Sequence, residues 1–224
     1  DYSVFYPGKI KSNETVFFVC GKCEIRKGSY EIVKAFNLAF EKTDNVRLKL
    51  SWHNIFNTKE EQDNWDASAK WSKLHDKIEL IPRLNSSRQI AKIMRESDVL
   101  VSFSKAEGWN LPALHALSTG LTVIATRNTA QTDFLDSQNS ILIDTPELED
   151  ANDGGKFFNG KDFEGQVGQW HKIGNDQIDQ LVYWMRELHR IKQEFGGLSQ
   201  DPQLETAKRF SWKNSAEKLL EAIS

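Results

Sequence analysis

Several features are scarce in this chain of 224 residues, and each scarcity narrows what the protein can be. No apolar run approaches the roughly 18 residues that a membrane-spanning helix needs, so no transmembrane segment is predicted. The formal net charge of −3 and the pI near 6.0 show no excess of positive charge. The composition therefore argues against a general binder of nucleic acids or membrane surfaces.

Cysteine is also rare, since Cys20 and Cys23 are the only two. Their C-x-x-C spacing suits a redox pair only when the first cysteine opens a helix, and here the next helical pattern starts near Gly28. A zinc site would need two further ligands at matching spacing, and none is evident. We interpret the pair as reduced thiols in a strand-to-helix loop, which fits a cytoplasmic protein.

The start of the sequence lacks two familiar features. Residues 1–15 contain no basic segment followed by an apolar one, so no signal peptide is predicted. The first residue is Asp1 rather than methionine. We therefore expect that a further piece of the protein precedes this chain.

Strand and helix patterns alternate over the first 143 residues. Apolar or alternating runs predict strands at 16–19, 46–52, 78–81, 99–103, 122–125 and 141–143. Helical spacing between them predicts helices at 29–42, 58–74, 86–96 and from Leu111 to Gly120. This alternation is typical of an α/β fold, and it predicts a Rossmann-like parallel sheet with helices on both faces. We interpret residues 1–224 as one such domain.

The alternation of strand and helix patterns stops at residues 145–175, which are rich in Gly, Asp and Asn and show no sustained hydrophobic period. So long an irregular stretch is unusual inside a domain, and we interpret it as an insertion containing a hairpin. Trp170 within it is expected to pin the segment, with stacking on a sugar as the alternative. Residues 176–224 return to helical spacing, with helices expected at 176–195, 202–210 and 211–223.

The loop after the first predicted strand, residues 21–30, carries the first candidate site. A phosphate there would meet backbone N–H groups, a helix N-terminus and cationic side chains together. The loop matches neither G-x-G-x-x-G nor a Walker A sequence, so a solvated basic loop is the alternative. Its two glycines and three cations are Gly21, Gly28, Lys22, Arg26 and Lys27.

The loop between the fourth strand and the next helix carries the second candidate, Glu107. A carboxylate at the carboxyl end of a parallel strand is well placed to accept hydrogen bonds from ligand hydroxyl groups. Charges are rarely kept beside a buried run for stability alone. The alternative is that Asn110 is a simple helix N-cap and Glu107 a surface acid.

Two long stretches carry a family resemblance: VFFVCGKCEIRKGSYEIVKAF and, further on, SDVLVSFSKAEGWNLPALHALSTGLTVIAT. They resemble the donor-binding domain of the group 1 (family 4) glycosyltransferases, and the closing AKRFSWKNSAEKLLEAI resembles the end of such enzymes. The resemblance covers nearly the whole chain. It implies one half of a GT-B architecture and a retaining, hexosyltransferase-like enzyme that moves a sugar from a nucleotide diphosphate to an acceptor hydroxyl.

The resemblance also implies roles for matching positions. Lys22 and Lys27 correspond to the basic residues that bind the diphosphate, and Glu107 to the first glutamate of the E-x7-E motif, which touches sugar hydroxyls. Catalytic roles are therefore expected for these three. Donor or nucleotide binding is expected at Gly21, Arg26, Arg83, Leu84, Gly108, Trp109, Asn110, Leu111 and His115.

The chain departs from the family pattern at three places. His115 replaces the second glutamate of E-x7-E, so a neutral imidazole stands where two acceptor oxygens would hold the ribose diol. Lys22 replaces an arginine, so a compact ammonium stands where a planar guanidinium could donate two parallel hydrogen bonds. Thr129, Ala130 and Asp133 occupy the places of two glycines and a glutamate.

No Asp-x-Asp cluster points to a metal, so neither a metal nor another cofactor is expected. The expected partners are a nucleotide sugar, a hydroxyl-bearing acceptor and the missing N-terminal domain that holds the acceptor. Without that domain we expect donor binding with little turnover. Two alternatives stay open: a non-catalytic nucleotide or nucleotide-sugar binding module, and a nucleotide-sugar epimerase-like enzyme on the same architecture.

Overall fold

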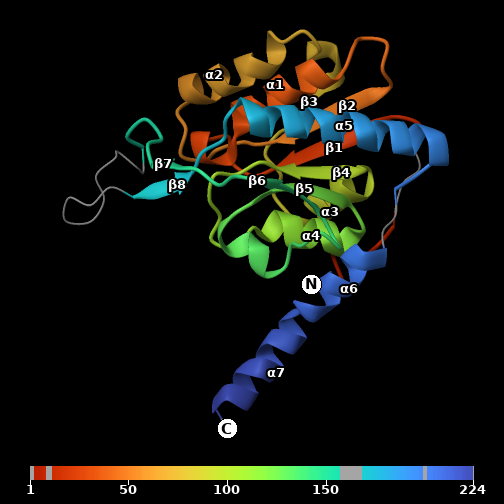
Figure 1. The fold of residues 1–224 in the computed structure, drawn as a ribbon, viewed down its shortest axis with the longest axis vertical. Coiled ribbons are helices and arrows are strands. Elements are labelled where there is room, and N and C mark those ends of the chain that lie inside the picture. The colour runs from red at the N-terminus through yellow and green to blue at the C-terminus, as the bar shows by residue number, and fades with distance from the viewer. Residues whose placement is uncertain (1–2, 9–11, 157–167, 199–200, 224) are drawn as a thin grey trace.

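The structure is a computed structural model that describes residues 3–8, 12–156, 168–198 and 201–223 (Figure 1). Six parallel strands form one sheet in the order β3-β2-β1-β4-β5-β6. Their bounds are β1 Thr15–Cys20, β2 Val46–Ser51, β3 Ile78–Leu80, β4 Val99–Ser102, β5 Thr122–Arg127 and β6 Ile141–Asp144. The predicted Rossmann-like α/β fold is thereby confirmed.

Helices cover both faces of the sheet, as Figure 1 shows. Helices α1 (Ser29–Ala39), α2 (Lys59–Lys70) and α5 (Asn175–Phe195) lie on one face, and α3 (Ser87–Arg95) and α4 (Leu111–Thr119) on the other. Short 3-10 turns are η1 Ile25–Lys27, η2 His75–Lys77 and η3 Thr129–Asp133. The chain closes with α6 (Asp201–Arg209), which packs on α4, and α7 (Trp212–Ile223), which projects from the body. Within the described ranges no helix has the length and apolar character to cross a membrane.

Strand β1 shows why its sequence is apolar almost throughout. Phe17 is fully buried in the core between the sheet and helices α1 and α5, whereas Phe18 is fully buried in the core beneath α3 and α4. Successive side chains of a strand point to opposite faces, so a central strand with two covered faces needs apolar residues at every position.

A buried ion pair ties α5 to the sheet. Lys192 of α5 donates to Asp98 Oδ2 at 2.7 Å, and the same oxygen accepts the backbone N–H of Val16 at 2.8 Å. The Lys192 and Asp98 side chains are only 5% and 2% exposed. The pair therefore holds the long helix against the amino-terminal ends of β1 and β4.

The predicted hairpin is present within the insertion. Strand β7 (Leu148–Asp150) pairs antiparallel with β8 (Gln169–His171), while residues 157–167 lie outside the described residues. Trp170 is buried and donates from Nε1 to Glu149 Oε1 at 3.0 Å, so the pinning role is the one that fits. The backbone N–H of His171 donates to Lys105 O at 3.0 Å, which fastens the hairpin to the loop after β4.

Gly28 is the point where the loops after β1 and β4 come closest. Its φ is +62°, and a Cβ built there would lie 2.1 Å from the carbonyl oxygen of Phe103. We expect Gly28→Ala to lower the free energy of unfolding by about 3 kcal/mol, because it adds a left-handed backbone penalty to a clash with rigid backbone. Urea unfolding would measure the loss.

Gly196, which ends α5, is the matched control. Its φ is +72°, but a Cβ there has no atom within 4 Å. Gly196→Ala should therefore cost only the backbone part, about 1 kcal/mol. Equal losses for the two variants would contradict the close approach at Phe103.

Candidate functional site

The candidate site lies where β1 and β4 are neighbours in the sheet. The chain winds outward in opposite directions from these two strands, so their carboxyl ends border the crevice in which open α/β sheets bind ligands. The two loops are joined directly. The backbone N–H of Lys105 donates to Arg26 O at 2.7 Å, and Arg26 Nη1 donates to Ala106 O at 2.6 Å.

An ion pair between Lys27 and Glu107 forms the centre of the site. Lys27 Nζ donates to Glu107 Oε1, and the Ser104 hydroxyl donates to the same oxygen at 2.5 Å. The Glu107 side chain is only 7% exposed, so the alternative of a surface acid is wrong. The structure thus joins two residues that the sequence assigned to one donor site from loops 80 positions apart.

The pair retains unused binding capacity. A lysine ammonium has three N–H donors, of which Glu107 takes one. The second oxygen, Glu107 Oε2, lies 3.6 Å from Arg26 Nη1, which is beyond hydrogen-bond distance. The ammonium can therefore meet a phosphate and the carboxylate a hydroxyl without the ion pair breaking.

Thr129 positions the backbone of Glu107 and was not singled out as a site residue by the sequence. Its Oγ1 accepts the Glu107 N–H at 2.8 Å, and its φ is +47°. A positive φ is strained for a β-branched residue. The signal for it was available, because the resemblance places a glycine at this position.

Asn110 precedes α4 in a left-handed conformation with φ of +67°, and its side chain makes no capping bond. The carboxamide instead donates to Ser102 Oγ at 2.9 Å and to Gln131 Oε1 at 2.6 Å. Asn110 is therefore the N-cap of α4 by position, as the alternative had it, but its side chain does not cap the helix. It fastens the start of α4 to the end of β4 and to η3, which fixes the backbone of residues 108–111.

Arg26 and Lys22 are turned toward Glu24. Arg26 Nη2 donates to Glu24 Oε1, and Lys22 Nζ lies 3.5 Å from Glu24 Oε2 and 5.0 Å from the centre of the Phe56 ring. The Arg26 guanidinium is therefore used mainly in contacts within the loop after β1 and with the loop after β4. Gly21 lies beside Lys27, since a Cβ there would be 3.8 Å from Lys27 Nζ. A phosphate role for Lys22, Arg26 and Gly21 stays a prediction.

Trp109 and the pair Arg83 and Leu84 lie away from the ion pair. The Trp109 ring packs against Phe134 and Phe210 at centroid distances of 5.3 and 5.9 Å. Arg83 and Leu84 follow β3, which is separated from β1 by β2. Arg83 and Leu84 therefore lie two strand spacings, roughly 10 Å, from the end of β1 along the same edge of the sheet. Base binding there remains a prediction.

His115 lies one turn into α4, with its ring stacked on Phe5 at 3.8 Å and an interplanar angle of 8°. Burial lowers the pKa of His115 from 6.5 to about 4, so the imidazole is neutral near pH 7. A neutral ring offers one donor and one acceptor, as the sequence predicted.

The stacked imidazole predicts a pH dependence of stability. The unfolded chain takes up the proton near pH 6.5 and the folded chain only near 4, so the unfolding free energy should fall as the pH drops through that window. His115→Phe keeps an aromatic ring against Phe5 but cannot titrate. Urea unfolding of both proteins across the window should show a smaller acid loss for the variant, and parallel curves would contradict the assignment.

The described residues hold no metal-ligand cluster, and both cysteines of this region have raised pKa values. In the part of the chain that the structure describes, no group of three or more His, Cys, Asp or Glu side chains could hold a metal ion. Burial raises the pKa of both Cys20 and Cys23 to about 11, so both thiols stay protonated. Protonated thiols are poor nucleophiles, which agrees with the interpretation that the pair has no redox role.

The fold matches solved structures of glycosyltransferases. The C-terminal domain of LpcC, a group 1 family protein from Francisella tularensis, has a TM-score of 0.64 at 18% identity, with 94% of this chain and 97% of that one covered. Sucrose-phosphate synthase from Thermosynechococcus elongatus has a TM-score of 0.67 at 15% identity, with 100% and 51% covered. HepE from Anabaena, in complex with UDP and glucose, has 0.67 at 13%, with 94% and 48% covered. These likenesses show the fold alone, which is that of the Rossmann-like domains of GT-B glycosyltransferases.

The sequence comparison identifies the family. The model of the family described as glycosyl transferases group 1 matches residues 5–156, more than half of the chain, and this protein belongs to that family. The chain spans about half the length of sucrose-phosphate synthase and of HepE, at 51% and 48%. A comparison with curated protein sequences finds no match.

Proposed function

We propose that this chain is the donor-binding half of a retaining glycosyltransferase, which binds a nucleotide-diphosphate sugar for transfer of a hexose to an acceptor hydroxyl. The observation that carries the proposal is the Lys27–Glu107 pair, which places a cation and a carboxylate side by side at the crevice between β1 and β4. A donor of this class presents both a diphosphate and sugar hydroxyls, and the pair has one group for each.

Lys27, Lys22 and the N-termini of α1 and α4 would stabilise the negative charge that grows on the departing diphosphate. Glu107 would hold a sugar hydroxyl and orient the ring. Fixed groups aimed at developing charge need no reorganisation during the reaction, which is why the tethering of Glu107 by Thr129 and Ser104 matters. With cations and helix dipoles in place, we propose that the reaction needs no metal.

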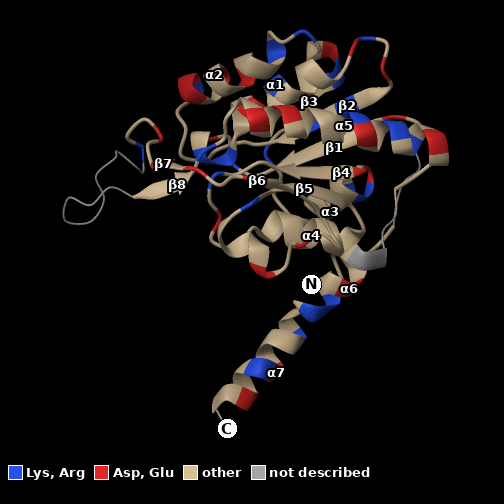
Figure 2. Cartoon of the chain, viewed as in Figure 1, with Lys and Arg blue, Asp and Glu red and all other residues tan. Residues whose placement is uncertain are grey.

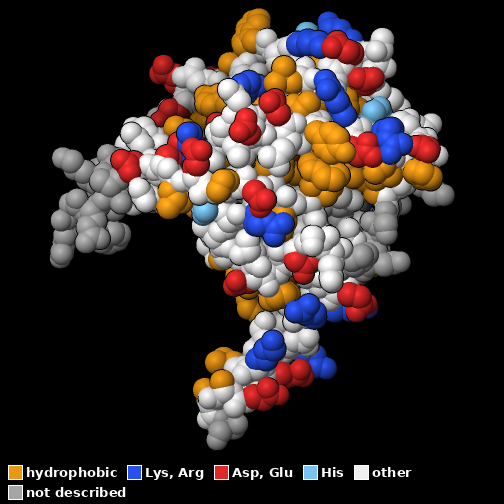
Figure 3. Space-filling model, viewed as in Figure 1, with side chains coloured by type: hydrophobic (Ala, Val, Ile, Leu, Met, Phe, Trp, Pro, Cys, Tyr) orange, Lys and Arg blue, Asp and Glu red, His pale blue; other side chains and the backbone are white. Residues whose placement is uncertain are grey.

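The acceptor would bind to an N-terminal domain outside this chain. The apolar side of α7 is exposed, with Trp212 77%, Leu219 64% and Ile223 73% accessible, and Figure 3 shows apolar atoms along this helix. An exposed apolar helix face is typical of a surface that another domain covers. We therefore expect this chain alone to bind donor with little or no turnover. We also propose that the protein is cytoplasmic.

Isothermal titration with UDP-glucose, GDP-mannose and ADP-glucose tests the proposal. One of the three should bind, and the matching nucleoside monophosphate should bind more weakly because it lacks the second phosphate that Lys27 would meet. The proposed function fails if none of the three binds even at millimolar concentration.

A non-catalytic binding module is the second candidate, favoured by the replacement of a ribose-binding glutamate by His115 and its stacking on Phe5. His115→Glu separates the two. If the site has lost its ribose contact, the new carboxylate should accept a hydrogen bond from the ribose diol again. Nucleotide binding should then tighten about fivefold, the value of one hydrogen bond. In a working site adapted to His115, affinity should stay level or fall. Membership of a glycosyltransferase family favours sugar transfer over the epimerase-like alternative.

A further inference from the structure

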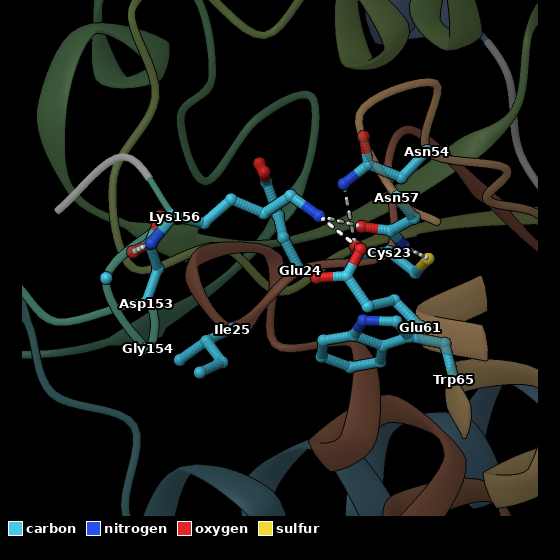
Figure 4. Close-up of a pocket in the computed structure, with 11 residues that line it drawn as sticks. Cys23, Glu24, Ile25, Asn54, Asn57, Glu61, Trp65, Asp153, Gly154 and Lys156 are labelled. Atoms are coloured by element: carbon cyan, nitrogen blue, oxygen red, sulfur yellow. Dashed lines mark hydrogen bonds and ion pairs between the residues drawn. The ribbon is translucent and has the colours of Figure 1, made fainter. Parts of the chain in front are cut away.

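A cavity of about 320 Å³ opens beside the donor site, on the far side of the loop after β1 (Figure 4). Four separate segments wall it: residues 23–25 of that loop, Asn54 and Asn57 after β2, Glu61 and Trp65 of α2, and residues 153–156 of the insertion. Lys27 and Glu107 do not line it. It is therefore distinct from the crevice between β1 and β4.

The insertion closes one side of the cavity through a defined contact. Lys156 extends across it and donates to Asn57 Oδ1 at 2.7 Å and to Glu61 Oε2 at 2.9 Å, as the dashed lines in Figure 4 show. Glu61 is itself held by the capping box at the start of α2, where its carboxylate accepts the Thr58 N–H at 2.6 Å. The wall is thus a built feature that joins residues 95 positions apart.

An aromatic side chain borders the cavity in a fixed orientation. The Trp65 ring stacks on Tyr30 at a centroid distance of 4.0 Å and an interplanar angle of 19°, and it packs against the core beside α1 and α2. A rigid aromatic ring supplies apolar contact area at little cost in conformational entropy.

The remaining lining groups decide the class of ligand. Three carboxylates, Glu24, Glu61 and Asp153, face one cation, Lys156, so an anionic ligand is disfavoured. The site also lacks the ligand cluster of a metal among the described residues. Carboxylates, carboxamides and an ammonium supply both acceptors and donors for hydroxyl groups. The volume lies at the low end of the range for ligand pockets, about 300–1,000 Å³, which suits one sugar ring better than a nucleotide sugar.

We propose that this cavity binds one pyranose unit of a neutral saccharide, with the ring against Trp65 and its hydroxyls on Glu24, Asn57 and Glu61. The inference does not depend on the donor proposal. The two sites are nonetheless linked, because Arg26 donates to Glu24 on the cavity wall and lies 3.6 Å from Glu107 Oε2. A bound saccharide would therefore sit next to the groups assigned to the donor, where an inner residue of an acceptor glycan could be held.

Titration of the chain with methyl α- and β-pyranosides of glucose, galactose and mannose, and with their disaccharides, tests the proposal. One glycoside should bind in the millimolar range and shift the indole N–H signal of Trp65. Trp65→Ala and Lys156→Ala should each weaken that binding by about tenfold. Tighter binding of a disaccharide would indicate a glycan chain as the source, and equal binding a single sugar.

Trp71→Ala is the matched control, because Trp71 also lies at α2 but is 87% exposed and away from the cavity. It should leave glycoside binding unchanged, as should Lys27→Ala, which separates failure here from failure of the donor site. The proposal is overturned if no glycoside binds, if binding survives in both the Trp65→Ala and Lys156→Ala proteins, or if inorganic phosphate occupies the cavity instead.

Discussion

Replacing Lys27 by alanine is expected to weaken binding of the nucleotide-diphosphate sugar by about 10- to 100-fold. The ammonium is held at the crevice by Glu107 and keeps two donors for a phosphate oxygen. A hydrogen bond to a charged group contributes about 1.5–3 kcal/mol, which corresponds to that range of affinity. Isothermal titration of both proteins at one fixed ionic strength would measure it, because phosphate contacts are screened by salt.

Lys34→Ala is the control for the loss of charge. Lys34 lies on the exposed side of α1, where it donates to Asn175 Oδ1 at 3.4 Å, and its removal changes the net charge by the same amount. It should leave donor affinity within about twofold of the original protein. If Lys27→Ala binds the donor as well as the original protein does, the phosphate assignment is wrong.

Lys192→Met is expected to lower the free energy of unfolding by about 3–5 kcal/mol, because it leaves the Asp98 carboxylate buried without its cation. Asp98 also accepts the Val16 N–H at the start of β1, so after the loss of Lys192 its charge would lie directly beneath the central strands. Urea unfolding near pH 7, monitored by circular dichroism, would measure the loss.

Two further variants test the explanation for that loss. Lys213→Met removes an ion pair in which Lys213 Nζ lies 3.9 Å from Glu217 Oε1 and the lysine side chain is 82% exposed. It should lower the free energy of unfolding by less than about 1 kcal/mol. Combining Lys192→Met with Asp98→Asn removes both charges and should recover much of the stability. A double variant as unstable as Lys192→Met alone would show that the loss comes from packing and not from the buried charge of the Asp98 carboxylate.

Much of the fold could be predicted because its signals are local. Phe17 and Phe18 are apolar neighbours on a strand with two covered faces, and Ile178, Leu181 and Met185 repeat at helical spacing along α5. The environment of α7 could not be predicted in this way. Trp212 lies in a predicted helix but is 77% exposed in this chain, because periodicity shows which side of a helix is apolar and not what covers it.

The candidate site was predictable where position in the topology decides it. Lys27 and Glu107 follow strands that become neighbours, so their approach follows from the doubly wound order. The direction of each side chain does not follow from topology. Arg26 turns to Ala106 and Glu24, the Trp109 ring turns to Phe134, and the contact from Thr129 to Glu107 depends on loop conformation.

Figure 2 illustrates the same limit for charge. Lys and Arg are interspersed with Asp and Glu over the helices, so the overall distribution does not mark the site. The paired groups that matter lie in two loops and are largely buried, as the 7% exposure of the Glu107 side chain shows. Counting charges along the sequence cannot separate such a pair from the many surface pairs around it.

The location of donor binding is tested most directly by the amide signals of the ¹⁵N-labelled chain during titration with the nucleotide sugar that binds. We expect the largest shifts on residues 21–28 and 107–111, the two loops joined by Lys27 and Glu107. Shifts confined to other parts of the chain, such as α7 or the far edge of the sheet at β6, would contradict it.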